Sequence, residues 1–166
     1  MARDYVIDTN IASYWFDEHA PQHALVKSHL ERIPRQSLFF SLFSLGEVEY
    51  GHRANPGFAD KQQAYAAFLQ ERFVLLGLEP GTTEEYGKIR AALFDKFGQG
   101  PKRKPGRRPE QLVDPETALS LGVQENDLWI AAQALAHDLT LVTGDRMEHI
   151  RKVAPDLVVE DWATST

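Results

Sequence analysis

Cysteine is absent from this 166-residue chain, and so is any long apolar run. Without cysteine, the chain can form neither disulfide bridges nor thiolate zinc sites. No hydrophobic stretch approaches the roughly 18 residues that a membrane span needs, and the N-terminus lacks the apolar core of a signal peptide. These absences predict a cytoplasmic protein that does not associate with membranes.

Positive charge is also scarce. Lys and Arg number 18 against 24 Asp and Glu, which gives a net charge of −6. This balance argues against broad, nonspecific binding of nucleic acid, but it leaves room for a local basic path or for a phosphate bridged by a metal ion. Hydrophobic residues make up 43% of the chain, and its length suits one domain with a real core, which we expect to span residues 1–166.

Short apolar runs alternate with helical patterns along most of the chain. The expected strands are Tyr5–Ile7, Leu38–Phe40, Phe73–Leu76, Thr140–Val142 and Leu157–Val159. The expected helices cover Ile11–Phe16, a stretch beginning at Pro21, a stretch through Leu45 to about Gly51, Phe58–Arg72, Thr82 to about Phe97, and Asn126–Leu135. We expect Thr9 or Asn10 to cap the first helix. The alternation predicts an α/β fold, with a parallel sheet of about five strands covered on both faces.

The alternation breaks at residues 99–120, a basic and proline-rich segment. Between Gln99 and Glu116 the segment holds four prolines. Its five basic residues are Lys102, Arg103, Lys104, Arg107 and Arg108. Such a segment cannot continue a helix and has little to bury, so we expect a mobile surface loop inserted in the domain. The cations could follow an RNA backbone, remain solvated, or contact an acidic segment of a partner.

Acidic residues lie at or near the ends of the expected strands. Asp8 directly follows the first strand, and Asp145 follows the fourth in the motif LVTGD. Asp127 opens the helix before the fourth strand, and Glu47 lies in the helix after the second. Ligands of parallel sheets sit beyond the carboxyl ends of the strands, so these four acids can converge. Carboxylates held that close need a compensating cation, and Mg²⁺ or Mn²⁺ with oxygen ligands can promote phosphodiester hydrolysis.

Each of these acids also has a structural interpretation. Asp8 could simply cap a helix, and Asp127 would be favourable at a helix N-terminus for its charge alone. Glu47 could be a solvated helix residue, and Asp145 could be a turn residue beside Gly144. The placement of all four acids together, rather than any one of them, favours a metal site.

Three blocks of the sequence resemble PIN domains, most of all the VapC ribonuclease toxins of type II toxin–antitoxin pairs. The blocks are VIDTN, SLGEVEYG and ENDLWIAAQALAHDLTLVTGD, and the resemblance extends from Tyr5 to about Trp162. It implies a Rossmann-like, three-layer α/β/α fold and an endoribonuclease that depends on Mg²⁺ or Mn²⁺. It further implies an antitoxin partner whose tail covers the active cleft, and a homodimer of the toxin.

The resemblance also assigns roles to individual residues. It places the catalytic and metal-binding acids at Asp8, Glu47, Asp127 and Asp145. The small polar position near the last acid falls on Thr143, and Asn10 and Asn126 are expected to support the site. Arg146, beside the last acid, is a candidate RNA contact together with the five cations of the insertion. The insertion itself departs from compact members of the family and bears on substrate entry and partner docking.

Two other functions are weighed against a nuclease. A haloacid-dehalogenase-like phosphatase also begins with an aspartate at a strand end. Its pattern needs a second aspartate where this chain has Asn10, and an acid where the chain has His149. A PIN domain that only binds RNA or protein is the other alternative, and the four filled acidic positions disfavour it.

Overall fold

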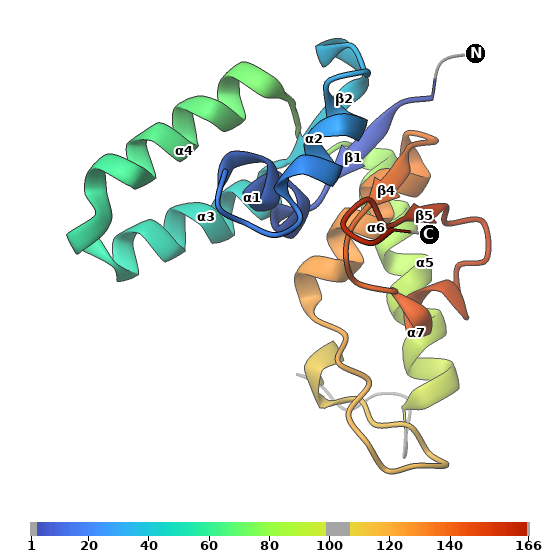
Figure 1. The fold of residues 1–166 in the computed structure, drawn as a ribbon. Coiled ribbons are helices and arrows are strands. Elements are labelled where there is room, and N and C mark those ends of the chain that lie inside the picture. Colours follow the sequence, from blue (N-terminus) through green and yellow to red (C-terminus); the bar gives the residue numbers. More distant parts are fainter. Residues whose placement is uncertain (1–2, 99–106, 166) are drawn as a thin grey trace.

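A five-stranded parallel sheet forms the centre of the molecule in the computed structural model, which describes residues 3–98 and 107–165 (Figure 1). The strands lie in the order β3-β2-β1-β4-β5. Their bounds are β1 Tyr5–Ile7, β2 Leu38–Ser41, β3 Val74–Leu76, β4 Thr140–Val142 and β5 Val159–Glu160. All four strand pairings are parallel. The predicted α/β/α sandwich around a parallel sheet of about five strands is therefore confirmed.

Seven α-helices lie within the described residues, and they cover the two faces of the sheet. Their bounds are α1 Thr9–Phe16, α2 His23–Leu30, α3 Leu42–Ala54, α4 Ala59–Arg72, α5 Pro80–Phe97, α6 Glu125–Ala136 and α7 Glu148–Arg151. The first four pack on one face and the last three on the other. Figure 1 shows α3 and α4 running together on one side, while α5, α6 and α7 gather on the opposite side.

Strand alternation divides the core into two layers. In β1, Val6 faces the layer that contains α5 and α6, whereas Ile7 faces the layer that contains α1 to α4. The neighbouring strand β4 repeats this division with Leu141 and Val142. Because successive side chains of a strand point to opposite faces, all-apolar strands of this kind suit a sheet buried on both sides.

The central position of β1 brings two strand ends together. Ile7 pairs with Phe40 of β2 on one side and with Val142 of β4 on the other. The backbone N–H of Asp8 donates to the carbonyl of Val142 at 2.9 Å. The chain leaves β1 at the point where the strand order reverses, with β2 on one side of β1 and β4 on the other. Ligands of α/β sheets bind at this topological position.

Several helix boundaries differ from the predicted ones. Helix α1 begins at Thr9, and its N-cap is Asp8 rather than Thr9 or Asn10. Helix α2 begins at His23, two residues after the expected start at Pro21. Helix α3 continues past Gly51 to Ala54, and its N-cap is Ser41, whose hydroxyl accepts the N–H of Phe43 at 3.1 Å. Asp8 follows β1 and also caps α1, so the helix begins one residue after the strand-end aspartate, earlier than predicted.

The described part of the insertion is ordered and partly buried, which corrects the expectation of a loop with little to bury. Pro109 begins a short 3-10 helix and is buried. Leu112 is only 1% exposed and belongs to the core layer of α5 and α6. Val113 forms an antiparallel bridge with Ser120. The expected mobility of residues 99–106 lies outside the described residues.

The C-terminal part of the chain differs in two further details. The fifth strand is Val159–Glu160 rather than Leu157–Val159, because Leu157 is buried in the core before the strand begins. The short helix α7 was not predicted. Within residues 3–98 and 107–165, none of the helices combines the length and apolar character that crossing a membrane requires.

Candidate active site

Asp8 lies at the carboxyl end of β1 and uses its two carboxylate oxygens differently. Oδ1 accepts the N–H of Thr9 at 2.7 Å, which is the capping bond of α1. Oδ2 accepts the hydroxyl of Thr143 at 2.7 Å. Burial raises the pKa of Asp8, the bonds from Thr143 and Thr9 lower it, and the charge of Asp145 raises it. The residue therefore caps a helix and also belongs to a group of acids.

Thr143 and Asn10 join the ends of β1 and β4. The fully buried Thr143 hydroxyl donates to Asp8 and accepts the N–H of Asp145 at 3.0 Å. Asn10 donates from Nδ2 to Asp8 at 3.2 Å and accepts the N–H of Gly144 at 3.2 Å. These bonds place both predicted supporting residues beside the first acid. An asparagine here has no proton to give as a general acid, which disfavours the phosphatase alternative.

Asp145 follows β4 on an exposed turn. Its Oδ1 accepts the N–H of Met147 at 3.1 Å, and Met147 has a left-handed backbone with φ 49°. A left-handed conformation is uncommon for a residue other than glycine. The Asp145 carboxylate thus stabilises the turn that carries it, as the structural interpretation anticipated, while its charge acts on Asp8 and Asp127.

Asp127 lies in the first turn of α6 and closes a capping box. Its Oδ2 accepts the N–H of Gln124 at 2.8 Å. The pKa of Asp127 is raised to about 6: burial is the largest cause, the bond from Gln124 lowers the pKa, and the charges of Asp145, Asp8 and Glu47 contribute to the rise. The four predicted acids, which come from distant parts of the sequence, therefore act on one another electrostatically in the folded chain.

Glu47 is exposed, as is Asp145, whereas Asp8 and Asp127 are partly buried. Glu47 projects from α3, and its Oε1 accepts Asn126 Nδ2 at 2.5 Å. Asn126 is the neighbour of Asp127 in the first turn of α6. The third predicted supporting residue thus fixes Glu47 against the helix that bears Asp127.

The chemistry of this donor set suits a hard divalent cation. All four acids offer carboxylate oxygens, and their mutual repulsion favours a bound positive charge. Across residues 3–98 and 107–165, no three His, Asp or Glu side chains are arranged so that they could hold a metal ion as they stand. Binding of an ion by these acids would therefore need their side chains to move closer together.

Of the predicted RNA-contacting cations that the structure describes, Arg146 and Arg107 line different hollows. Arg146 is exposed and lines a hollow of about 500 Å³ together with Asn10, Asp145 and His149. Arg107 extends its guanidinium over the ring of Phe94, with Cζ 5.8 Å from the ring centroid. Arg108 is exposed, and its backbone N–H donates to the side chain of Gln111. The predicted contacts Lys102, Arg103 and Lys104 lie outside the described residues.

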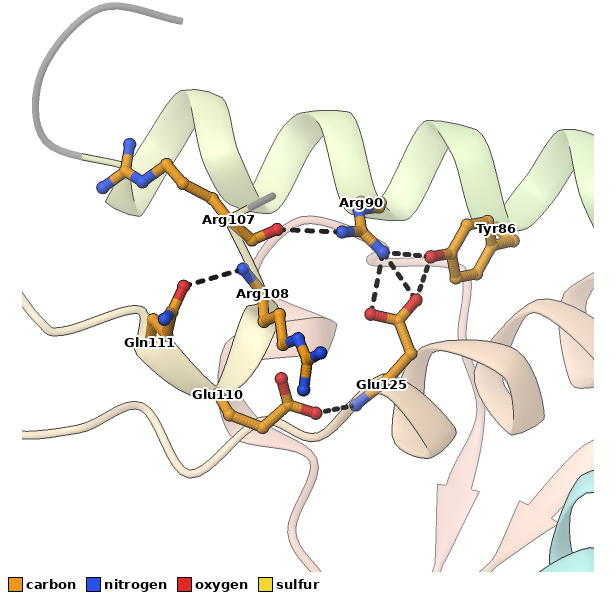
Figure 2. A network of polar contacts seen from close by, with 7 residues as sticks. All are labelled: Tyr86, Arg90, Arg107, Arg108, Glu110, Gln111 and Glu125. Atoms are coloured by element: carbon orange, nitrogen blue, oxygen red, sulfur yellow. Dashed lines mark hydrogen bonds and ion pairs between the residues drawn. The ribbon is translucent and has the colours of Figure 1, made fainter. Parts of the chain in front are cut away.

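Sequence reasoning missed a polar network that adjoins the site. Arg90 of α5 binds Glu125 in the first turn of α6, with Nη1 at 2.6 and 2.7 Å from the two carboxylate oxygens, and Tyr86 contacts both residues (Figure 2). One signal for this network was available: Arg90 lies four residues after Tyr86, next to the apolar face of the helix predicted from Thr82 to about Phe97. A charged residue beside such a face needs a partner.

Comparison with known proteins places this geometry in a family. The family model of the PIN domain matches residues 5–154. Ribonuclease VapC2 from Rickettsia felis is 26% identical over 159 residues, which covers 95% of this chain and 97% of the relative.

Solved structures show the same fold at lower identity. VapBC2 from Rickettsia felis, bound to a DNA fragment from its promoter, matches with a TM-score of 0.69 and 24% identity over 95% of this chain and 98% of that chain. VapBC-1 from nontypeable Haemophilus influenzae matches with a TM-score of 0.67 and 22% identity over 96% of this chain and 98% of the other.

Proposed function

This chain belongs to the PIN domain family, and from that premise we propose that it is a metal-dependent endoribonuclease, the toxin of a toxin–antitoxin pair. The observation that carries the proposal is the electrostatic coupling of Asp127 to Asp145, Asp8 and Glu47. The name of the relative from Rickettsia felis, a ribonuclease, supports the activity. We propose RNA as the substrate and Mg²⁺ or Mn²⁺ as the cofactor.

The mechanism assigns the four acids to a single metal-binding group. Asp8, Asp127 and Asp145 would hold the ion, and Glu47 would complete the set or orient the attacking water. A bound divalent ion supplies an activated water and stabilises the leaving oxygen of the phosphodiester. Thr143 holds Asp8 in place through its hydroxyl, and Asn126 holds Glu47. No covalent nucleophile is needed.

Cations outside the acidic group would bind the RNA backbone. Arg146 is placed for this role, because it lines two hollows together with Asp145. Neutralising a phosphate with an arginine makes binding weaker as salt increases. The net charge of −6 limits such contacts to a local surface.

Replacing Asp8 with Asn tests the proposed activity. The variant keeps the size of the side chain and an oxygen that can cap α1, so we expect the fold to persist. We expect RNA cleavage to fall at least about 100-fold, the scale of losing one group that stabilises charge in a transition state. Cleavage is measured on single-stranded RNA with Mg²⁺ or Mn²⁺, and Asp156→Asn, at an exposed aspartate, is the matched control.

Two outcomes would contradict the proposal. Cleavage that continues unchanged in excess chelator would exclude a role for the metal. RNA binding without turnover, equal in the wild type and in Asp8→Asn, would instead indicate a PIN domain that only binds.

The proposed partners are an antitoxin protein and a second copy of the chain. Solved neighbours of the same fold are VapBC toxin–antitoxin complexes. We expect a small protein to be encoded beside this chain, and its co-expression should yield a complex that suppresses RNA cleavage. The mass of the isolated chain in solution decides whether it forms a homodimer.

A further inference from the structure

The N-terminus of α6 is capped from outside the helix. The backbone N–H of Glu125, in the first turn, donates to Oε1 of Glu110 at 2.8 Å. The first N–H groups of a helix have no partner within the helix, so an acceptor supplied by another segment stabilises that end. Glu110 belongs to the short 3-10 helix Pro109–Gln111 of the insertion, 15 residues earlier in the chain.

Arg90 latches this segment to α6. Its Nη1 binds the carboxylate of Glu125, and its Nη2 donates to the carbonyl of Arg107 at 3.0 Å. Figure 2 shows the Arg90 guanidinium between the carbonyl of Arg107 and the carboxylate of Glu125, while the Glu110 side chain reaches the backbone N–H of Glu125. One side chain of α5 therefore holds both the helix end and the segment that caps it.

The capped turn carries two residues of the candidate active site. Asn126 and Asp127 directly follow Glu125, and Asn126 in turn binds Glu47 of α3. An aromatic stack supports the same arrangement. The ring centroid of Trp129 on α6 lies 3.8 Å from that of Tyr86 and 4.8 Å from that of Phe43 on α3. Loosening the first turn of α6 would therefore displace two of the four acids.

We propose that Glu110 is a positioning residue for the active site, acting through its cap on α6, and that Arg90 keeps the capping segment in place. The inference rests on the proposed nuclease function, in which Asp127 and Glu47 are catalytic. The ordered end of the insertion then serves the catalytic scaffold, a role distinct from a contact with RNA.

Two substitutions of Glu110 separate the cap from the charge. Glu110→Ala removes the acceptor, and Glu110→Gln keeps an oxygen acceptor but removes the charge. Glu110 is exposed, so both variants should fold. For Glu110→Ala we expect hydrogen exchange of the amides at 125–128 to become about tenfold faster, the scale of losing a helix cap. We expect kcat for RNA cleavage to fall by a similar factor with KM unchanged, while Glu110→Gln stays within about twofold of the wild type on both measures.

Arg90→Gln tests the latch against a control on the same helix. Releasing the segment should reproduce the faster exchange and lower kcat of Glu110→Ala. Lys88→Gln removes an equal charge from α5, where Lys88 binds Glu84 and Glu85 at 2.8 Å on the surface, and should change neither measure.

Three results would overturn the inference. Equal losses in Glu110→Ala and Glu110→Gln would show that the charge matters, not the cap. Unchanged exchange in Glu110→Ala would show that the bond does not hold the helix end. A raised KM with unchanged kcat would make Glu110 or Arg90 a substrate contact. If the wild type cleaves no RNA, the proposed function fails, while the exchange measurements still decide whether the cap exists.

Discussion

Asp127 has a pKa raised to about 6, and this value makes the stability of the folded chain depend on pH. In the unfolded chain the same group has the ordinary value of 3.8. Between pH about 4 and about 6 the folded state therefore holds a proton that the unfolded state has released. Because the folded state binds more protons than the unfolded state here, the free energy of unfolding falls as pH rises through this window and is lowest above it.

We expect the free energy of unfolding of the metal-free protein to decrease by about 3 kcal/mol between pH 4 and pH 7 through this group, at 1.36 kcal/mol per pKa unit. The raised pKa of Asp8 acts in the same direction. Denaturant unfolding in chelator at several pH values measures the slope. Asp127→Asn keeps an oxygen for the cap on Gln124 and should flatten the slope; an equally steep slope in the variant would assign it to other groups.

Thr143 offers a second test at the residue scale, because its hydroxyl lowers the pKa of Asp8. Thr143→Val keeps the shape of the side chain but removes the donor to Asp8 and the acceptor for Asp145. We expect a higher pKa for Asp8 and a loss of about 1–3 kcal/mol of stability, the cost of leaving buried polar groups unpaired.

The carboxyl carbon of Asp8, followed by NMR during a pH titration, reports this pKa. Thr143→Ser keeps the hydroxyl and is the control. If the two variants titrate at the same pH, the hydrogen bond does not set the ionisation of Asp8.

At the scale of elements, the insertion provides a matched pair of leucines. Leu112 is 1% exposed and packs in the core layer of α5 and α6, whereas Leu119, seven residues later, is 69% exposed. We expect Leu112→Ala to lower the free energy of unfolding by about 2–5 kcal/mol and Leu119→Ala to leave it nearly unchanged. Chemical denaturation of both variants measures the difference, and a small loss in Leu112→Ala would restore the picture of a loosely attached loop.

The elements were predictable from the sequence where the signal is local. Val6, Ile7, Leu141 and Val142 form short apolar runs that end in polar residues, and both strands were predicted with the observed bounds. The insertion was not predictable, because its composition suggests exposure and Leu112 is buried only by contact with distant helices. The start of α1 was misplaced because Asp8 ends a strand and caps a helix at once.

At the scale of the whole molecule, the candidate site draws on four separate elements. Asp8 follows β1, Glu47 lies on α3, Asp127 on α6, and Asp145 follows β4. The proposed ion, held by these acids, would stabilise only the native arrangement, by about 2.7 kcal/mol at 100 times its Kd.

We therefore expect Mn²⁺ to raise the Tm of the entire domain in a single transition. Thermal unfolding with and without MnCl2 measures the shift, with NaCl of equal ionic strength as the control for screening. Asp145→Asn should lose most of the shift; a shift of the same size in this variant would place the ion elsewhere.

The site was only partly predictable at this scale. Strand ends point to Asp8 and Asp145, the adjoining helices point to Asp127 and Glu47, and the resemblance to PIN domains assigns roles to all four. Glu110 and Glu125 carry no such signal, and Arg90 carries only its position four residues after Tyr86, because the roles of all three depend on which helices meet in space. The sequence of one chain does not show which distant segments contact each other.

The placement of β4 beside β1 has a consequence for how the protein is made. Asp8 and Thr143, which share a hydrogen bond, are 135 residues apart in the chain. At about 5–20 residues per second, a ribosome takes roughly 7 to 27 s to add the second after the first. Throughout that interval the growing polypeptide has the first of the four site acids but not the last, so the proposed active site cannot form until translation is nearly finished.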